Sequence, residues 1–482
     1  MQKEPLSKVD TAWLRMEEPT NLMMITGIML LSEPMNIERF KTTIERRFLS
    51  FKRFRQRAVD NPRGAYWEID PDFDIDLHIR RSALPGTADL AELQDYVGDL
   101  ASTPLDKSRP LWQFHLVENY RGGQVLVTRI HHCIADGIAL IQVLLSLTDP
   151  GPDPRPSAHD SRTWRTRRLS ESNIFKRLTS PAREGFAFLG AIGQKTVEET
   201  LSLIGDPERV GVYAREAAEI AAELANSLSL PNDPETRFRG SLGRRKQVAW
   251  AEPISLADVK AISKGLGCTV NDLLIAAVTG ALHGYLTDLG EPPEKSLEIR
   301  VTVPVNLRPL EHAAELGNHF GLVFLPLPVG EVNPLMRVLK VSQNMNKLKS
   351  SRQAAVAFGL LAALGMGPSG LQKPALSALS KKATAVLTNV PGPQQPLYIA
   401  GVPIGEMMFW VPQNGTIGIG ISILSYNNKV FFGLIADRKL IPHPDEVIRR
   451  FKPEFEQLLY MVLLADPDAP LKVEDVEGLL GQ

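Results

Sequence analysis

The sequence has 482 residues, a formal net charge of −1 and 44% hydrophobic side chains. This length suits about two or three globular domains with sizeable cores, and the near-zero charge excludes a global electrostatic attraction to nucleic acid. Its two cysteines, Cys133 and Cys268, exclude a disulfide framework and fit a reducing compartment such as the cytoplasm.

The N-terminal part is predicted to be a mixed domain of strands and helices over residues 1–157. The first ten residues contain no apolar targeting segment. Hydrophobic periodicity predicts a strand at 22–31, an amphipathic helix at 37–48, a hairpin of strands 111–118 and 124–132, and a helix that begins directly after Asp136. Four prolines between residues 149 and 157 end this domain.

Residues 158–235 are predicted to form a long helical linker, with a basic stretch at 161–169. Residues 236–482 are predicted to form a second domain of strands and helices. Its expected elements are a helix at 270–286 whose start is marked by Thr269 and Asp272, strands at 297–305, 320–328, 384–390, 416–424 and 430–437, and a helix at 444–464.

The two longest apolar runs, 21–31 and 354–367, are shorter than the roughly 18 residues of a membrane-spanning helix. They are therefore predicted to be a buried strand and a buried helix. The alternative for 354–367 is a wall for an apolar ligand or a surface that faces a membrane.

The motif HHCIADG at 131–137 carries the most chemical information. On a strand, His131 and His132 point to opposite faces, which does not favour a metal site because zinc needs three or four convergent ligands. A neutral histidine can instead accept a proton at physiological pH. Asp136 can orient that ring or hold the turn, and Gly137 lets the chain enter a helix whose N-terminus favours negative charge. The equally weighted alternative is a structural histidine pair with a helix-capping aspartate.

Cys133 raises the question of covalent catalysis, since a thiol beside a base can form an acyl-enzyme. As a sequence neighbour of His132 it points the other way on a strand. We therefore do not expect Cys133 to act as a nucleophile, and covalent catalysis is kept as the minor alternative.

HHCIADG resembles the HHxxxDG motif of the CoA-dependent acyltransferase superfamily, which includes chloramphenicol acetyltransferases and peptide-synthetase condensation domains. Further blocks are similar to the bacterial wax ester synthase/diacylglycerol acyltransferase family, in that family's order and over nearly the whole chain: LSKVDTAWLRMEEPTNLMM (6–24), RPLWQFHLVE (109–118), VNDLLIAAVTGAL (270–282), PVNLRP (304–309), ELGNHFG (315–321) and TNVPGP (388–393). The Asp-Phe-Gly-Trp-Gly block of the condensation-domain relatives is absent from the sequence.

The resemblance implies an α+β fold with two chloramphenicol-acetyltransferase-like domains that face each other across a central channel. It implies transfer of a long-chain fatty acyl group from acyl-CoA to a fatty alcohol or diacylglycerol, with acyl-CoA as a substrate and no cofactor or metal. His132 carries over as the general base of a direct transfer between the two bound substrates, supported by His131, Asp136 and Gly137. Arg55 is a candidate partner of Asp136. Asn271 supports the site, with helix capping as its alternative role.

Such substrates need apolar channels, because burying a sixteen-carbon chain contributes on the order of 10 kcal/mol. The phosphates of CoA need cations, and the candidates form two clusters: Arg162, Arg165, Arg167 and Arg168, or Arg244, Arg245 and Lys246. The alternative for both clusters is a solvated surface. The stretch 161–169 could also dock on an anionic bilayer, so we expect a cytoplasmic protein that meets membrane or lipid-droplet surfaces peripherally.

Two other functions stay open at this point. One is a condensation-type acyltransferase that takes its acyl group from a carrier-protein thioester. The other is a non-catalytic lipid-binding or lipid-droplet protein, for which the His-Asp-Gly constellation would have no purpose.

Overall fold

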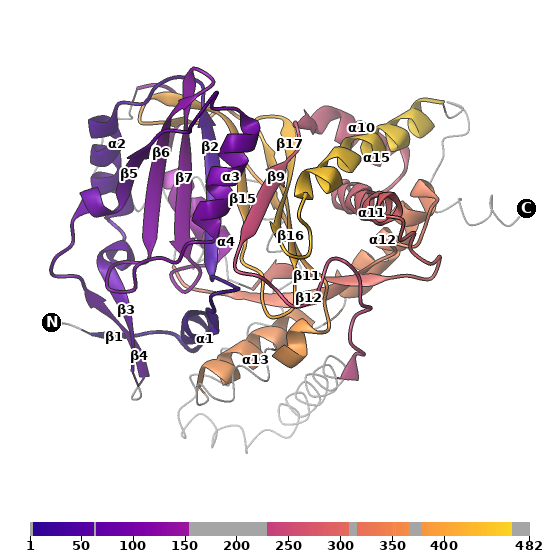
Figure 1. The fold of residues 1–482 in the computed structure, drawn as a ribbon, viewed down its shortest axis with the longest axis horizontal. Helices are drawn as coiled ribbons and strands as arrows, with labels where there is room; N and C mark the ends of the chain where they lie inside the picture. Colours follow the sequence, from indigo (N-terminus) through magenta and orange to yellow (C-terminus); the bar gives the residue numbers. More distant parts are fainter. Residues whose placement is uncertain are drawn as a thin grey trace, which may run out of the picture.

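The computed structural model describes residues 3–61, 64–153, 229–307, 316–349, 351, 353–366 and 377–464. These residues form two seven-stranded sheets, one on each side of the molecule, with helices packed against them (Figure 1). The predicted linker lies outside the described residues as far as residue 228, and so does the basic stretch 161–169. Mixed strands and helices in two halves confirm the predicted fold class.

The N-terminal sheet has the strand order β5-β6-β7-β2-β15-β14-β8. Its strands are β2 (Met24–Leu31), β5 (Ile79–Ser82), β6 (Trp112–Tyr120), β7 (Gly123–His131), β8 (Thr148–Asp149), β14 (Tyr398–Ile399) and β15 (Val402–Trp410). The helices of this half are α1 (Lys8–Met16), α2 (Ile37–Thr43), α3 (Leu90–Ala101) and α4 (Gly137–Ser146). A small sheet of β1 (Glu4–Pro5), β3 (Gln56–Asn61) and β4 (Gly64–Ile69) lies beside them.

The C-terminal sheet has the order β10-β17-β16-β13-β11-β12, and β9 also pairs with β17. Its strands are β9 (Lys246–Trp250), β10 (Ile254–Ser255), β11 (Ile299–Asn306), β12 (Phe320–Leu327), β13 (Ala385–Pro391), β16 (Ile419–Tyr426) and β17 (Lys429–Asp437). The helices of this half are α10 (Leu256–Gly265), α11 (Val270–Asp288), α12 (Pro334–Lys349), α13 (Gln353–Met366) and α15 (Pro444–Leu464).

Local sequence signals explain several of these elements. Helix α11 begins with a complete capping box, in which Thr269 and Asp272 each accept a hydrogen bond from the other's backbone N–H. Strands β16 and β17 are joined at Asn427 and Asn428, whose φ angles of 47° and 59° fit the two central positions of a hairpin turn. The capping box confirms the helix start predicted from the sequence.

Two strands of the N-terminal sheet, β14 and β15, come from the C-terminal half of the chain. β15 pairs antiparallel with β2, and Phe409 lies opposite Gly27. The sequence analysis did not predict this strand, because its alternation is broken at a register shift between Ile404 and Glu406. The two halves therefore share a sheet, which fixes the position of one against the other.

Among the described residues, no single helix has both the length and the hydropathy of a membrane span. Helices α10 and α11 reach these limits only when counted together, across a bend of 99°. Most side chains of α11 are buried in the protein core.

Candidate active site

The HHCIADG motif lies at the end of β7, where the chain leaves the N-terminal sheet. The strand ends at His131, one residue earlier than predicted, and His132 begins the following turn. The backbone N–H of His132 donates to the carbonyl of Met23 on the neighbouring segment, at 2.7 Å. This bond holds the turn against the edge of β2.

Asp136 caps helix α4 and also binds the other half of the chain. Its Oδ1 accepts a hydrogen bond from the N–H of Ala139 at 2.8 Å, and its Oδ2 accepts one from the N–H of His319 at 3.0 Å. The N–H of Asp136 donates to the carbonyl of Gly317 at 3.3 Å. The carboxylate therefore fixes segment 316–319 against the motif, so the predicted capping role and a structural role at the site are both present.

Gly137 is the first residue of α4. A Cβ built on it would meet no atom within 4 Å, and its φ lies outside the left-handed region. The backbone therefore does not require glycine here. What a glycine preserves is open space beside the start of α4, five residues after the candidate base.

Two aromatic side chains flank the ring of His132. Trp13 of α1 stacks on it with 4.1 Å between ring centroids and 15° between planes, and Phe320 of β12 lies 5.5 Å away at 47°. His132 is only 4% exposed, and its Nδ1 atom is fully buried. Because Nδ1 is buried, Nε2 is the candidate nitrogen for contact with a substrate.

The environment of His132 keeps the imidazole neutral. Burial lowers its pKa from 6.5 to about 4, although the charge of Asp136 and the contact with Asn318 oppose this shift. A neutral ring can accept a proton at physiological pH, as general-base catalysis requires.

Asn318 connects the carbonyl of His132 to a second buried carboxylate. Its Nδ2 donates to the His132 carbonyl oxygen and to Asp10 Oδ1, both at 2.7 Å. Burial raises the pKa of Asp10, and the backbone N–H of Asn318 donates to the same oxygen at 3.1 Å. This chain of bonds ties α1 to the turn that carries the base.

His131 serves the structure, as its opposite orientation predicted. Its Nδ1 accepts a hydrogen bond from the N–H of Cys133 at 3.1 Å, and its Nε2 lies 3.1 Å from Glu17 Oε2. Lys107 Nζ lies 2.8 Å from the other oxygen of Glu17. Burial opposes ionisation of Glu17, but His131 and Lys107 together lower its pKa to about 2.

Cys133 is fully buried, and burial together with the charges of Asp10 and Glu17 raises the pKa of its thiol well above the ordinary value. A nucleophilic cysteine needs a low pKa and access to solvent. The environment of Cys133 has neither property, which argues against an acyl-enzyme.

Two further predicted residues, Arg55 and Asn271, have exposed side chains. Arg55 ends a short 3₁₀ helix (Lys52–Arg55) with its side chain exposed, whereas Asp136 is 3% exposed, so their pairing stays a prediction. Asn271 is exposed in the first turn of α11, where its Oδ1 accepts a hydrogen bond from Asn389 Nδ2 on β13. This bond joins two of the blocks identified in the sequence.

The predicted cation cluster at 244–246 is divided by the fold. Lys246 is 7% exposed, and its Nζ pairs with Asp437 Oδ2 at 2.8 Å. This ion pair removes Lys246 from the predicted set of CoA-binding cations. Arg244 and Arg245 are exposed, and Arg244 lines a small cavity of about 10 Å³ together with Thr20 and Met24. The arginines of 161–169 lie outside the described residues.

Helix α13 covers the site from below in the view of Figure 1, where it lies next to α1 and β12. Its Phe358 stacks on His319, with ring centroids 6.2 Å apart. Residues 357–360 of this wholly apolar stretch are only partly buried. The helix is thus present as predicted, and it lies beside the residues that flank the base.

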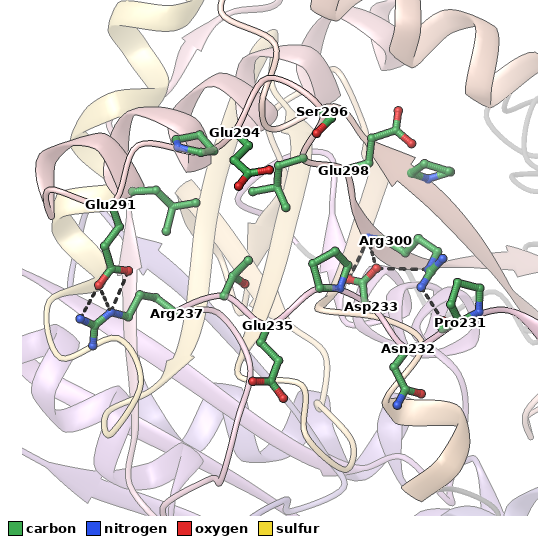
Figure 2. A pocket seen from close by; sticks show the side chains of 16 residues that line it. Pro231, Asn232, Asp233, Glu235, Arg237, Glu291, Glu294, Ser296, Glu298 and Arg300 are labelled. Carbon is green, nitrogen blue, oxygen red and sulfur yellow. Dashed lines mark hydrogen bonds and ion pairs between the residues drawn. The ribbon is translucent and has the colours of Figure 1, made fainter.

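A cavity of about 630 Å³ lies elsewhere, on the C-terminal half (Figure 2). Its carboxylates are Asp233, Glu235, Glu291, Glu294 and Glu298, and each of its two arginines, Arg237 and Arg300, pairs with one of them. Such a lining repels a polyanion. This cavity is therefore not a candidate site for CoA.

Sequence reasoning did not identify Asp10, Trp13, Asn318 or Phe320 as site residues. All four lie in the quoted blocks 6–24 and 315–321. One signal could have identified them. Both blocks occur in the same order relative to HHCIADG as in the acyltransferase family that they resemble, and both contain aromatic or amide side chains.

Comparisons with known proteins agree with this site. A model of the wax ester synthase/diacylglycerol acyltransferase catalytic domain matches residues 6–274, and a model of the C-terminal domain of the same family matches 316–459. The chain is 27% identical over 430 residues to the probable diacylglycerol O-acyltransferase tgs1 of Mycobacterium tuberculosis H37Rv, covering 88% of each chain. It is 29% identical over 410 residues to tgs2 of the same organism, covering 81% of this chain and 83% of the relative.

Solved structures show the same fold. The wax ester synthase/diacylglycerol acyltransferase from Marinobacter aquaeolei VT8 superimposes with a TM-score of 0.65 at 22% identity, over 94% of this chain and 98% of its own. The first condensation domain of the calcium-dependent antibiotic synthetase superimposes with a TM-score of 0.58 at 15% identity, over 98% of both chains. With catalytic and C-terminal family models matched in order around the HHCIADG site, this chain belongs to the wax ester synthase/diacylglycerol acyltransferase family.

Proposed function

We propose that the chain transfers a long-chain fatty acyl group from acyl-CoA directly to a fatty alcohol or to diacylglycerol, with His132 as the general base. Its family membership makes the chain an acyltransferase of wax ester and triacylglycerol synthesis. One observation supports the assignment of the base: burial keeps the imidazole of His132 neutral where Asn318 and Phe320 of the second half meet it.

The proposed reaction needs one proton acceptor and no cofactor. Nε2 of His132 takes the proton from the alcohol as its oxygen attacks the thioester carbonyl carbon. The carbon–sulfur bond then breaks, and the proton returns from the imidazolium to the departing thiolate. Asp10, Asn318 and Asp136 hold the turn and the facing segment in place during both steps.

The acyl chain needs an apolar wall that leads to the base. We propose that the partly buried face of α13 supplies part of it. This helix is apolar after Gln353, and it packs against α1 and β12, the elements that carry Trp13 and Phe320. The space beside Gly137 is the proposed approach for the thioester, since no atom of the described residues lies within 4 Å of a Cβ built there.

Release of free thiol from palmitoyl-CoA, with and without hexadecanol, tests this function. The proposed reaction gives alcohol-dependent release and an ester product. Lipid binding without thiol release would instead favour the lipid-coat alternative. A carrier-protein thioester that serves as donor where palmitoyl-CoA does not would favour the condensation-type alternative.

We predict that kcat/KM for palmitoyl-CoA stays nearly constant between pH 8 and about pH 5 and falls below about pH 4. The pKa of about 4 for His132 means that the base is neutral throughout the upper range and becomes protonated only below it. Brief assays in buffers of constant ionic strength, with circular dichroism to confirm folding, would measure this profile. An acid limb centred near pH 6.5 would contradict a buried base.

We also propose that the protein meets lipid surfaces peripherally, through the C-terminal end of α15. Tyr460, Leu463 and Leu464 are 59%, 67% and 85% exposed there. Val462 of the same turn packs against Gly265 at the end of α10, next to the exposed Lys264. Apolar side chains beside a lysine suit an anionic bilayer surface.

Replacing Leu463 and Leu464 by glutamate is expected to weaken co-flotation with vesicles of phosphatidylcholine and phosphatidylglycerol at least tenfold. Each substitution removes an apolar side chain that would be buried in the bilayer and adds a negative charge that the anionic lipid repels. Leu289→Glu, a 42% exposed leucine at the end of α11, is the matched control and should leave binding unchanged. Equal binding by both variants would exclude this surface.

A further inference from the structure

The side chain of Trp13 combines two properties that the proposed mechanism has not used. It is 6% exposed, and its indole Nε1–H finds no hydrogen-bond acceptor within the described part of the chain. A buried donor without a partner is unfavourable for folding and occurs in few places in a protein. This donor belongs to the ring that stacks on the candidate base.

The reaction creates a need for such a donor. When the alcohol oxygen bonds to the thioester carbon, the π electrons of the carbonyl move onto its oxygen, which becomes an oxyanion. The proton goes to Nε2 of His132 at the same time. When the carbonyl re-forms, the electrons of the broken carbon–sulfur bond leave with sulfur, which takes the proton back. A donor aimed at the oxyanion stabilises the intermediate more than the substrate.

Of the two aromatic rings that flank the base, only Trp13 can donate a hydrogen bond, since Phe320 has no polar atom. The N-terminus of α4 is a weaker choice. The carboxylate of Asp136 lies there and already accepts from Ala139, so it offsets the attraction for a second negative charge.

We propose that Trp13 is a catalytic residue whose indole Nε1–H donates a hydrogen bond to the oxyanion of the tetrahedral intermediate. This role rests on the proposed acyl transfer at His132. It also explains why a buried donor is left unpaired: in the free protein the acceptor has not yet formed.

Trp13→Phe tests the proposal, because phenylalanine keeps an aromatic ring and removes the donor. Removal of one oxyanion donor typically lowers kcat by about a hundredfold to a thousandfold. We expect this loss in kcat with little change in KM, together with a somewhat lower melting temperature because the smaller ring leaves a cavity. A purely structural role of the indole predicts the lower melting temperature without the split between kcat and KM.

Trp410→Phe is the matched control. Trp410, at the end of β15, is fully buried, and its Nε1–H also has no hydrogen-bond partner among the described residues. It packs against Trp250 of β9 and not against the base. This control is expected to keep wild-type kcat. Equal activities of the two variants would overturn the donor role of Trp13, whereas absence of alcohol-dependent thiol release in the wild type would instead overturn the proposed function.

A second variant and a binding measurement guard against a folding defect. Replacing Trp13 by benzothienylalanine keeps the shape of the indole and substitutes sulfur for N–H, so it should reproduce the loss in kcat. The variant should also bind a trifluoromethyl ketone analogue of palmitoyl-CoA, which forms a tetrahedral adduct, at least tenfold more weakly than the wild type. A thioether analogue without a carbonyl should bind both equally. Unchanged binding of the ketone would reject the proposal.

Discussion

His132→Ala is expected to lower the rate of ester formation from palmitoyl-CoA and hexadecanol by about a hundredfold to ten thousandfold. This is the range that a positioned general base contributes. The substitution removes the nitrogen that takes the alcohol proton, while the backbone bonds of residue 132 to Met23 and Asn318 can persist. Binding of palmitoyl-CoA, measured by calorimetry, should change little.

His115→Gln provides the matched control for this loss. His115 of β6 is also a buried histidine whose pKa is lowered to about 4 by burial and by the charge of Arg129. Its Nδ1 lies 3.3 Å from the hydroxyl of Tyr96 on α3, and it has no place in the proposed reaction. We expect near wild-type turnover from this variant. A His132→Ala enzyme that retains alcohol-dependent turnover would remove His132 from its assigned role.

Asp136→Ala is expected to destabilise the protein by about 2–4 kcal/mol and to lower kcat. The substitution leaves the backbone N–H groups of Ala139 and His319 without their carboxylate acceptor. Loss of a helix N-cap costs about 0.5–2 kcal/mol, and each buried unpaired donor costs about 1–3 kcal/mol. Chemical denaturation followed by circular dichroism measures the loss.

Asp89→Ala separates simple capping from this double role. Asp89 caps α3 in the same half of the protein, where it accepts from Glu92 at 3.0 Å. This variant should lose only about 0.5–2 kcal/mol and keep its activity. If both aspartate variants were equally stable and equally active, the bond from Asp136 to His319 would have no role in holding the site together.

Local signals in the sequence predicted the elements that carry the motif. The strand-then-helix pattern around 131–137 and the capping box at Thr269 and Asp272 are both confirmed. Each depends on residues a few positions apart, for which hydrophobic period, capping and turn chemistry are informative.

Contacts between distant segments could not be predicted in this way. The bond from Asn318 to Asp10 joins residues 308 positions apart, and the ion pair of Lys246 with Asp437 joins residues 191 apart. In neither pair do the neighbouring residues in the sequence indicate which distant residue will be the partner. For this reason the sequence alone groups Lys246 with Arg244 and Arg245 as candidate CoA-binding cations. It also gives no sign that Trp13 stacks on His132.

The strand β15 shows a related limit. Its nine residues alternate imperfectly because of the register shift at Glu406, so they give a weak strand signal, and their partner β2 lies in the other half of the sequence. The resemblance to known acyltransferases compensated for this at the level of the fold. It identified two facing domains without specifying which strands they share.

Direct transfer of the acyl group with His132 as the base is tested most directly by a single-turnover measurement. Enzyme preloaded with palmitoyl-CoA is mixed rapidly with hexadecanol, and free CoA and wax ester are quantified over time. Our account predicts no CoA release before the alcohol arrives, then equal rates of CoA and ester formation in the wild type and neither product on that timescale in His132→Ala. A stoichiometric burst of CoA before alcohol is added, or unchanged ester formation by His132→Ala, would contradict it.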